Sequence, residues 1–155
     1  MKRVFDLLCD YDRKLKIDDE IRKIQGNIIF RRTGVTMEGE EKEEEADIMA
    51  LKKELAEIEL KPVKSISSAD VYTMLQSLKQ KVSRKQVEEM IWEVDEDLDG
   101  CIDWTEFRLM FTRNAIDRTG LECSKMFNLT QFLIYDHNNN GLVSVDETMN
   151  MLYAR

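Results

Sequence analysis

Two twelve-residue segments in the C-terminal half share one pattern of polar side chains, and this pattern constrains the fold more than any other feature. The segments run DEDLDGCIDWTE over residues 95–106 and DHNNNGLVSVDE over residues 136–147. Each has an oxygen-bearing side chain at positions 1, 3, 5 and 9, glycine at position 6 and glutamate at position 12. The repeated match at six constrained positions predicts two ion-binding loops, each flanked by helices.

The spacing of these side chains suits calcium, which takes six to eight hard oxygen ligands at loose geometry. In the first loop the predicted ligands are the side chains of Asp95, Asp97, Asp99, Asp103 and Glu106 and the backbone carbonyl of Cys101. In the second loop they are the side chains of Asp136, Asn138, Asn140, Ser144 and Glu147 and the backbone carbonyl of Leu142. Because the first loop offers more carboxylates, we expect it to bind calcium more tightly than the second loop.

Charge and cysteine content limit the other classes of function. The net charge of −8 argues against a nucleic-acid backbone as the main partner, because phosphate binding needs a basic surface. Three cysteines without metal-type spacing indicate free thiols in a reducing compartment, and no segment approaches the roughly 20 apolar residues that a membrane span needs. We therefore expect a cytoplasmic protein without a membrane span.

Catalytic signatures are weak throughout the chain. It has no glycine-rich phosphate loop and no nucleophile elbow, and His137 is its single histidine. Cys9 and Cys123 cannot be tied to a histidine base. We expect a protein that is not an enzyme.

The segment from Ile66 to Glu106 resembles one lobe of the EF-hand proteins calmodulin and troponin C. It runs ISSADVYTMLQSLKQKVSRKQVEEMIWEVDEDLDGCIDWTE, with a helix, a linker and the first calcium loop in the order of that family. The resemblance implies an all-α fold of helix-loop-helix hands with short paired loop strands, preceded here by extended or coiled-coil-like helices. It also implies a degenerate loop over residues 59–70, in which Lys61 and Val63 occupy ligand positions and Lys64 stands where glycine belongs.

Two pairing schemes are open for these three hands. The spacing of loop starts favours pairing of the degenerate hand with the first calcium loop, which leaves Val143 at position 8 of the second loop in need of another strand. In the other scheme the two calcium loops pair, and residues 59–70 form only a turn. We expect the first scheme, and we expect an EF-hand domain over residues 59–155.

Residues 1–58 are predicted to form a helical extension with an acidic linker. The acidic run lies in residues 39–47, after a turn predicted over residues 34–39, and suits either a solvated linker or a helix face. Apolar residues recur at seam spacing in two stretches, Ile17, Ile21, Ile24 and Ile28, then Ile48, Leu51, Leu55 and Ile58. Val4, Leu8, Tyr11 and Leu15 recur at the same spacing, and a break of phase between residues 15 and 17 predicts two helical pieces before residue 34. The seams suit either docking on the C-terminal domain or binding of a partner helix.

These features together predict a calcium-binding adaptor or sensor that docks on a larger protein assembly through helical contacts. The alternative is a constitutive structural subunit of a cytoskeletal or axonemal complex, with fixed or vestigial calcium sites. Residues 113–136, RNAIDRTGLECSKMFNLTQFLIYD, resemble EF-hand proteins of cilia and favour a cytoskeletal or ciliary location. The expected cofactor is Ca²⁺, and the expected partner is a helical protein.

Overall fold

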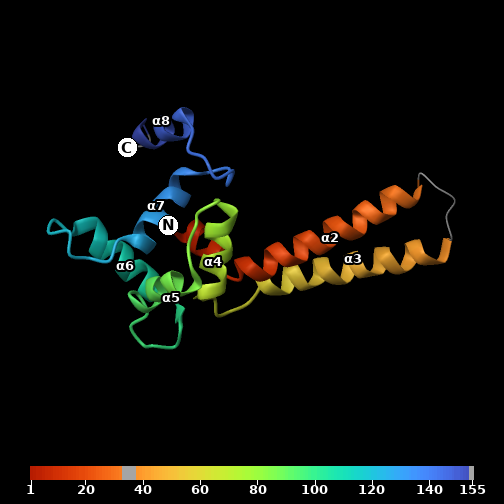
Figure 1. The fold of residues 1–155 in the computed structure, drawn as a ribbon, viewed down its shortest axis with the longest axis horizontal. Coiled ribbons are helices and arrows are strands. Elements are labelled where there is room, and N and C mark those ends of the chain that lie inside the picture. Colours follow the sequence, from red (N-terminus) through yellow and green to blue (C-terminus); the bar gives the residue numbers. More distant parts are fainter. Residues whose placement is uncertain (33–37, 154–155) are drawn as a thin grey trace. The chain divides into compact units, whose positions relative to one another are not determined.

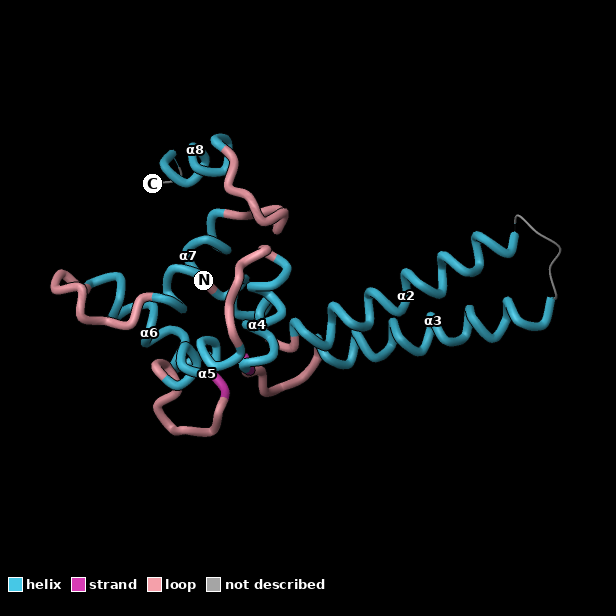
Figure 2. The backbone as a smooth tube through the Cα atoms, viewed as in Figure 1, coloured by secondary structure: helices cyan, strands magenta, loops and turns pink. Residues whose placement is uncertain are grey.

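The computed structural model describes residues 1–32 and 38–153, and helices make up most of this part of the chain. In chain order the elements are α1 (Lys2–Leu8), α2 (Tyr11–Arg32), α3 (Glu38–Glu59), β1 (Ile66–Ser67), α4 (Ser68–Ser77), α5 (Arg84–Trp92), β2 (Cys101–Ile102), α6 (Trp104–Ile116), α7 (Lys125–Tyr135) and α8 (Val145–Tyr153). Figure 1 shows these elements in sequence colours, and Figure 2 shows that helices dominate the trace. The predicted all-α fold with short paired loop strands is confirmed.

The chain divides into two compact units, and the division differs from the boundary expected at residue 58. One unit contains residues 12–63, and the other combines residues 1–11 with residues 64–155. Residues 1–11 belong with the C-terminal residues because α1 buries Val4, Phe5 and Leu8 completely in their shared core. Periodicity along α1 predicted an apolar face but could not predict what covers it.

The unit of residues 12–63 consists mainly of the helices α2 and α3, which lie side by side (Figure 1). Ile17 and Ile21 of α2 are buried with Ile58 of α3, and partly buried residues of α3 extend the cluster, namely Ile48, Leu51 and Leu55. The buried parts of the two seams therefore pack against each other, and binding of a partner helix stays a prediction. The coiled-coil geometry predicted for the seams stays a prediction.

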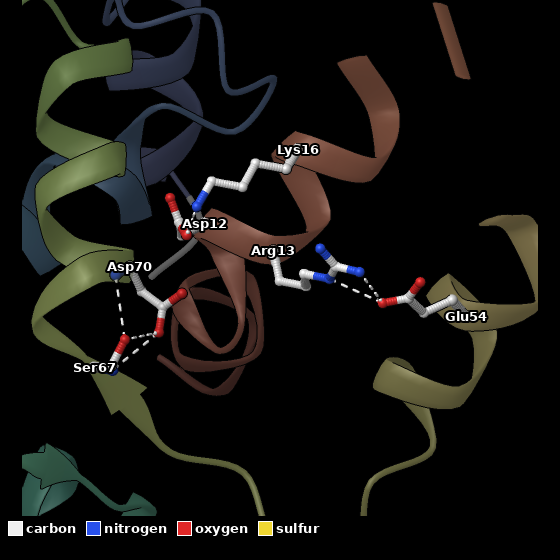
Figure 3. A network of polar contacts seen from close by, with 6 residues as sticks. All are labelled: Asp12, Arg13, Lys16, Glu54, Ser67 and Asp70. Carbon is white, nitrogen blue, oxygen red and sulfur yellow. Dashed lines mark hydrogen bonds and ion pairs between the residues drawn. The ribbon is translucent and has the colours of Figure 1, made fainter. Parts of the chain in front are cut away.

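Ionic contacts support this helix pair. The guanidinium of Arg13 donates hydrogen bonds to Glu54 Oε1 at 2.8 and 2.6 Å, and Lys16 pairs with Asp12 one turn away at 2.6 Å (Figure 3). The side chains of Arg13 and Glu54 are about half and two-fifths exposed, so the bridge sets register more than it adds stability.

Two local expectations in the N-terminal part need correction. The acidic run of residues 39–47 lies within α3, which begins at Glu38, so it forms the helix that was one of its two interpretations and not an irregular linker. The predicted break in the first helical stretch falls at Cys9 and Asp10 rather than at residues 15–17, since Asp10 adopts the left-handed conformation with φ of 54°. Most of the turn predicted over residues 34–39 lies outside the described residues.

The other unit is organised around one core to which α1 and the helices α4–α7 contribute. Its two-stranded antiparallel sheet joins β1 to β2 with Ile66 opposite Ile102, and both side chains are fully buried. Phe5 packs edge-on against Trp104 at 5.2 Å between ring centroids and against Phe107 at 5.4 Å. Four methionines, Met74, Met90, Met110 and Met126, are buried and so serve as core.

Candidate functional site

The first calcium loop lies between α5 and α6 and gathers three carboxylates at its mouth. Oxygens of Asp95, Asp97 and Asp99 all lie within 4.8 Å of one another. Asp95 is buried, whereas Asp97 and Asp99 are exposed. Glu106, at the closing position, is also buried, with 8% of its surface exposed. Such a cluster of oxygens, open on one side and anchored on the other, fits a hard divalent cation.

Backbone N–H groups hold the carboxylates of this loop in place. Gly100 N–H donates to Asp95 Oδ2 at 2.8 Å, and Cys101 N–H donates to Asp99 Oδ1 at 2.8 Å. Glu106 accepts from Glu96 N–H at 2.8 Å, and its other oxygen accepts from Asp103 N–H at 2.9 Å. These hydrogen bonds orient the side-chain oxygens of the loop without the help of an ion.

Asp103 has a second role at the start of α6. Its carboxylate accepts a hydrogen bond from Glu106 N–H at 2.8 Å, while Glu106 bonds back to the Asp103 N–H, which completes a capping box. Position 9 of the loop thus serves as the helix N-cap. The backbone carbonyl predicted as a ligand at position 7 belongs to Cys101, whose thiol has a pKa raised by burial and stays protonated.

The second calcium loop, between α7 and α8, has the same hydrogen-bond scaffold. Gly141 N–H donates to Asp136 Oδ2 at 2.8 Å, and Leu142 N–H donates to Asn140 Oδ1 at 2.8 Å. Ser144 N–H donates to Glu147 Oε2 at 2.9 Å, with Ser144 Oγ close by at 2.8 Å. The two loops therefore match position by position, although three of the five ligand side chains differ between them.

The remaining residues of the second loop complete this match. His137 N–H donates to Glu147 Oε1 at 3.0 Å, and Asn140 N–H donates to Asn138 Oδ1 at 3.0 Å. Asp136 is fully buried, whereas His137 is exposed. The structure thus gathers Asp95, Asp97 and Asp99 in the first loop and ties Glu147 to both sides of the second, while the full ligand sets stay predictions.

The electrostatic states of the two loops differ. In the first loop, the Asp99 N–H lowers the pKa of Asp97, but desolvation and the negative charges of Asp99 and Glu106 outweigh it, so the pKa is raised. In the second loop, hydrogen bonds from Ser144 lower the pKa of Glu147. Like charges are therefore crowded in the first loop and are not crowded in the second. A bound cation relieves such crowding, so the donor set of the first loop fits calcium especially well.

The two loops also differ at position 4, where the backbone is left-handed in both. Leu98 has φ of 62° and Asn139 has φ of 56°. Asparagine tolerates this region, whereas leucine is strained there because its Cβ approaches the backbone. The side chain of Leu98 is also 69% exposed, so packing does not explain the strain.

The degenerate loop of residues 59–70 has the hydrogen bonds that join positions 9 and 12 in the calcium loops. Ser67 N–H donates to Asp70 Oδ2 at 2.9 Å, and Ser67 Oγ contacts the same oxygen at 2.6 Å (Figure 3). These contacts repeat the link between positions 9 and 12 in the calcium loops. Lys64, at position 6, pairs with Asp6 of α1 at 3.6 Å. In this hand the lysine ammonium of position 6 provides a positive charge, whereas the other two loops have glycine at that position.

The sheet settles which hands pair. Position 8 of the degenerate loop, Ile66, lies opposite position 8 of the first calcium loop, Ile102, so the predicted scheme is confirmed. Val143 holds the same position in the second calcium loop and is 38% exposed. Residues 142–144 form no strand in the described part of the chain. The second calcium loop therefore stands outside the sheet.

A hollow beside the second loop was not foreseen from the sequence. It has a volume of about 420 Å³ and lies among α4, α5 and α7, with an apolar lining that includes Leu75, Leu78, Val82, Met90, Leu129 and Phe132. Gly141 lines it as well, and a Cβ added there would lie 3.4 Å from the side chain of Leu78. Long-range packing creates this hollow, and no local pattern could have revealed it.

Comparisons with known proteins agree with this geometry. The family model of the EF-hand domain pair matches residues 63–114, which contain β1, β2 and the first calcium loop. The chain is similar to "Calcium-binding protein CML19" of Arabidopsis thaliana, with 35% identity over 81 residues that cover 52% of this chain and 46% of that protein. It is also similar to "Troponin C" of Todarodes pacificus, with 27% identity over 84 residues that cover 54% of this chain and 53% of that protein.

The chain thus spans about half the length of the curated relatives it matches. Among the described residues, no helix is both long enough and apolar enough to cross a bilayer. The matched domain pair, the paired loops and the carboxylate cluster all lead to the same assignment. Residues 63–114 therefore match an EF-hand domain pair, and the chain is similar to calcium-binding EF-hand proteins over about half of its length.

Proposed function

We propose that this protein is a calcium-binding adaptor that docks on a larger protein through its C-terminal unit. The metal is held by the side chains of the first loop, Asp95, Asp97, Asp99, Asp103 and Glu106, with the Cys101 carbonyl. The second loop forms a weaker calcium site. Its ligands are the Leu142 carbonyl and the side chains of Asp136, Asn138, Asn140, Ser144 and Glu147. When bound, calcium neutralises the carboxylates that the loops hold together.

The observation that carries the docking role is the apolar hollow among α4, α5 and α7. Among the described residues, the apolar seams of α2 and α3 pack against each other, so we assign the docking surface to the other unit. The hollow, in contrast, is open and has Gln80 and Lys125 among its lining residues. An apolar cavity with a few polar groups is the usual form of a recognition site. The partner that fits is an amphipathic helix that inserts apolar side chains into the hollow.

The alternative role is a constitutive subunit of a cytoskeletal or axonemal complex. The packing of the buried Phe5 of α1 against Trp104 and Phe107 of α6 supports a unit with little freedom to open. In that role calcium is held permanently, and the exposed apolar surface does not change on binding.

A calcium titration in millimolar magnesium, followed by tryptophan fluorescence, separates these roles. Trp92 ends α5 just before the first loop, and Trp104 lies within the loop, so both report on it. A transition between roughly 10⁻⁷ and 10⁻⁵ M supports the adaptor switched by calcium, since sensor sites bind in that range. A signal that changes only when a strong chelator is added supports the constitutive subunit. Absence of any transition in metal-free protein contradicts both roles.

Docking is tested by binding of a synthetic amphipathic helical peptide, with and without calcium. The variant Leu78→Glu places a charge at the rim of the hollow, and we expect it to weaken peptide binding at least tenfold. Leu121→Glu is the matched control, because Leu121 is 85% exposed and lies outside the hollow. Equal peptide affinity of the two variants would contradict docking in the hollow.

A further inference from the structure

The short helix α1 contacts all three hands of the C-terminal unit. It buries Val4, Phe5 and Leu8, with at most 1% of each side chain exposed, so it is a fixed part of the core. Its polar residues reach outward from this anchor in different directions. Asp6 pairs with Lys64 of the degenerate loop at 3.6 Å.

The same helix touches the first calcium loop at position 10. The Lys2 ammonium lies 4.6 Å from the centre of the Trp104 ring, and the Phe5 ring packs against the same side chain at 5.2 Å between centroids. Trp104 begins α6 directly after the helix cap Asp103. A displacement of the C-terminal end of the first loop therefore also displaces α1, because the rings of Trp104 and Phe5 are closely packed.

The contact of α1 with the second calcium loop is made by Arg3. Its guanidinium donates to the carbonyl of Leu133 at 2.5 Å and to Asn139 Oδ1 at 3.4 Å. Leu133 lies in the last turn of α7, where carbonyls lack partners within the helix. Its partner in a continuing helix would be the N–H of residue 137, but the N–H of His137 donates to Glu147 instead. The guanidinium of Arg3 therefore donates to the Leu133 carbonyl in place of the His137 N–H.

Arg3 therefore holds the loop on both sides of its first ligand. Leu133 precedes Asp136 by three residues, and Asn139 follows it by three. Asn139 sits at the left-handed position of the loop, where its conformation shapes the turn. An arginine suits this task, because its planar guanidinium donates in two directions at once.

No β-ladder joins the two calcium loops in the described part of the chain, since the sheet contains only β1 and β2. The helix α7 packs on α5 and α6, and α1 contacts residues of both calcium loops, Trp104 of the first and Asn139 of the second. We propose that α1 couples calcium binding at the second loop to calcium binding at the first, with Arg3 as the positioning residue. This inference rests on the calcium sites proposed above and adds a link between them.

The test uses the full chain and reads each loop separately by NMR. The amides of Gly100 and Gly141 each donate to the first carboxylate of their own loop at 2.8 Å, so their resonances report calcium at the first and second loop respectively. Calcium titrations are compared for the unchanged chain, Glu106→Gln, Arg3→Ala and the double variant. Because coupling between sites is reciprocal and commonly fivefold or more, we expect Glu106→Gln to weaken the second loop about fivefold.

In the Arg3→Ala background we expect Glu106→Gln to have no further effect on the Gly141 transition. Arg3→Lys should recover part of the coupling, because lysine can donate to the Leu133 carbonyl but lacks the second arm. Arg22→Ala, which removes an equal charge from α2 at a residue paired with Asp19, is the control and should behave as the unchanged chain. Asn139→Gly removes the acceptor while keeping the left-handed turn, and it provides a second route if Arg3→Ala does not fold.

The outcomes separate the coupling from the sites themselves. A Glu106→Gln effect that is equal with and without Arg3, or absent in both, overturns the coupling while the two calcium sites stand. A Gly141 amide that never responds to calcium in the unchanged chain overturns the second site and the coupling together. Loss of the Glu106→Gln effect in Arg3→Ala, with partial return in Arg3→Lys, supports the proposal.

Discussion

The two calcium loops have the same backbone scaffold and different surroundings. In both, glycine at position 6 donates to aspartate at position 1 at 2.8 Å, and the residue at position 9 donates to glutamate at position 12 at 2.9 Å. The first loop crowds carboxylates and pairs in a sheet, whereas the second is poor in charge and unpaired. The shape of such a loop therefore depends on few positions, while its charge and its partner vary freely.

The largest contrast is expected in folding stability at position 8. Ile102→Ala removes a fully buried side chain from the paired sheet, and we expect it to lower the free energy of unfolding by about 2–4 kcal/mol. Val143→Ala truncates a side chain that is 38% exposed, and we expect a loss of about 0.5 kcal/mol or less. Urea unfolding of the calcium-free chain, followed by circular dichroism, measures both. Equal losses would show that Val143 has a buried partner in solution.

The next contrast concerns the closing glutamates. Glu106→Gln and Glu147→Gln each remove a charge and weaken a two-oxygen ligand, so each should lower the affinity of its own loop on the order of a hundredfold. Isothermal titration calorimetry then isolates the remaining site in each variant. We expect the first loop, measured in Glu147→Gln, to bind calcium more tightly than the second loop, measured in Glu106→Gln. The reverse order would contradict the assignment of the first loop as the stronger site.

Exchange of the side-chain charge at position 5 should bring the calcium affinities of the two loops closer together. Asn140→Asp adds a carboxylate to the second loop, and Asp99→Asn removes one from the first, with expected changes of about tenfold upward and downward in calcium affinity. The Gly141 and Gly100 amides report the two affinities separately. If neither exchange moved the affinities, ligand charge would not be the source of the difference.

A smaller contrast lies at position 4. Leu98→Asn relieves a strained left-handed leucine, and we expect it to stabilise the chain by about 0.5–1 kcal/mol, whereas Asn139→Leu should destabilise it. Thermal unfolding without calcium compares both variants with the unchanged chain. A destabilising Leu98→Asn would show that the exposed leucine has a contact in solution.

The smallest effect concerns the turn that connects the two hands. The carboxylate of Asp117 accepts hydrogen bonds from the hydroxyl and the N–H of Thr119 and from the N–H of Glu122, which lower its pKa from 3.8 to about 2. A lowered pKa stabilises the fold above pH 3.8, and this contribution is lost as the pH falls toward 2. Asp117→Asn should remove that part of the acid dependence, measured as unfolding midpoints between pH 2 and 5, and leave both calcium affinities unchanged.

The loops were predictable because their ligands and glycines are local in sequence. The pairing of Ile66 with Ile102 was also predictable, because the spacing of loop starts carried it. The location of α1 was not, since the burial of Phe5 depends on Trp104 and Phe107, about 100 residues away. The mutual packing of the two N-terminal seams was missed for a related reason. Seam spacing shows that a helix face must be covered, but it does not identify the cover.

The helix pair of α2 and α3 has a consequence for the thermodynamics of recognition. Each helix has 22 residues, so each is about 33 Å long at 1.5 Å per residue. Because the pair covers its own apolar seam, its helices are ordered before any encounter, and a partner that binds their outer faces gains preorganisation. Such binding buries charged rather than apolar surface. Its calorimetric signature is therefore a small heat-capacity change together with an affinity that falls as ionic strength rises.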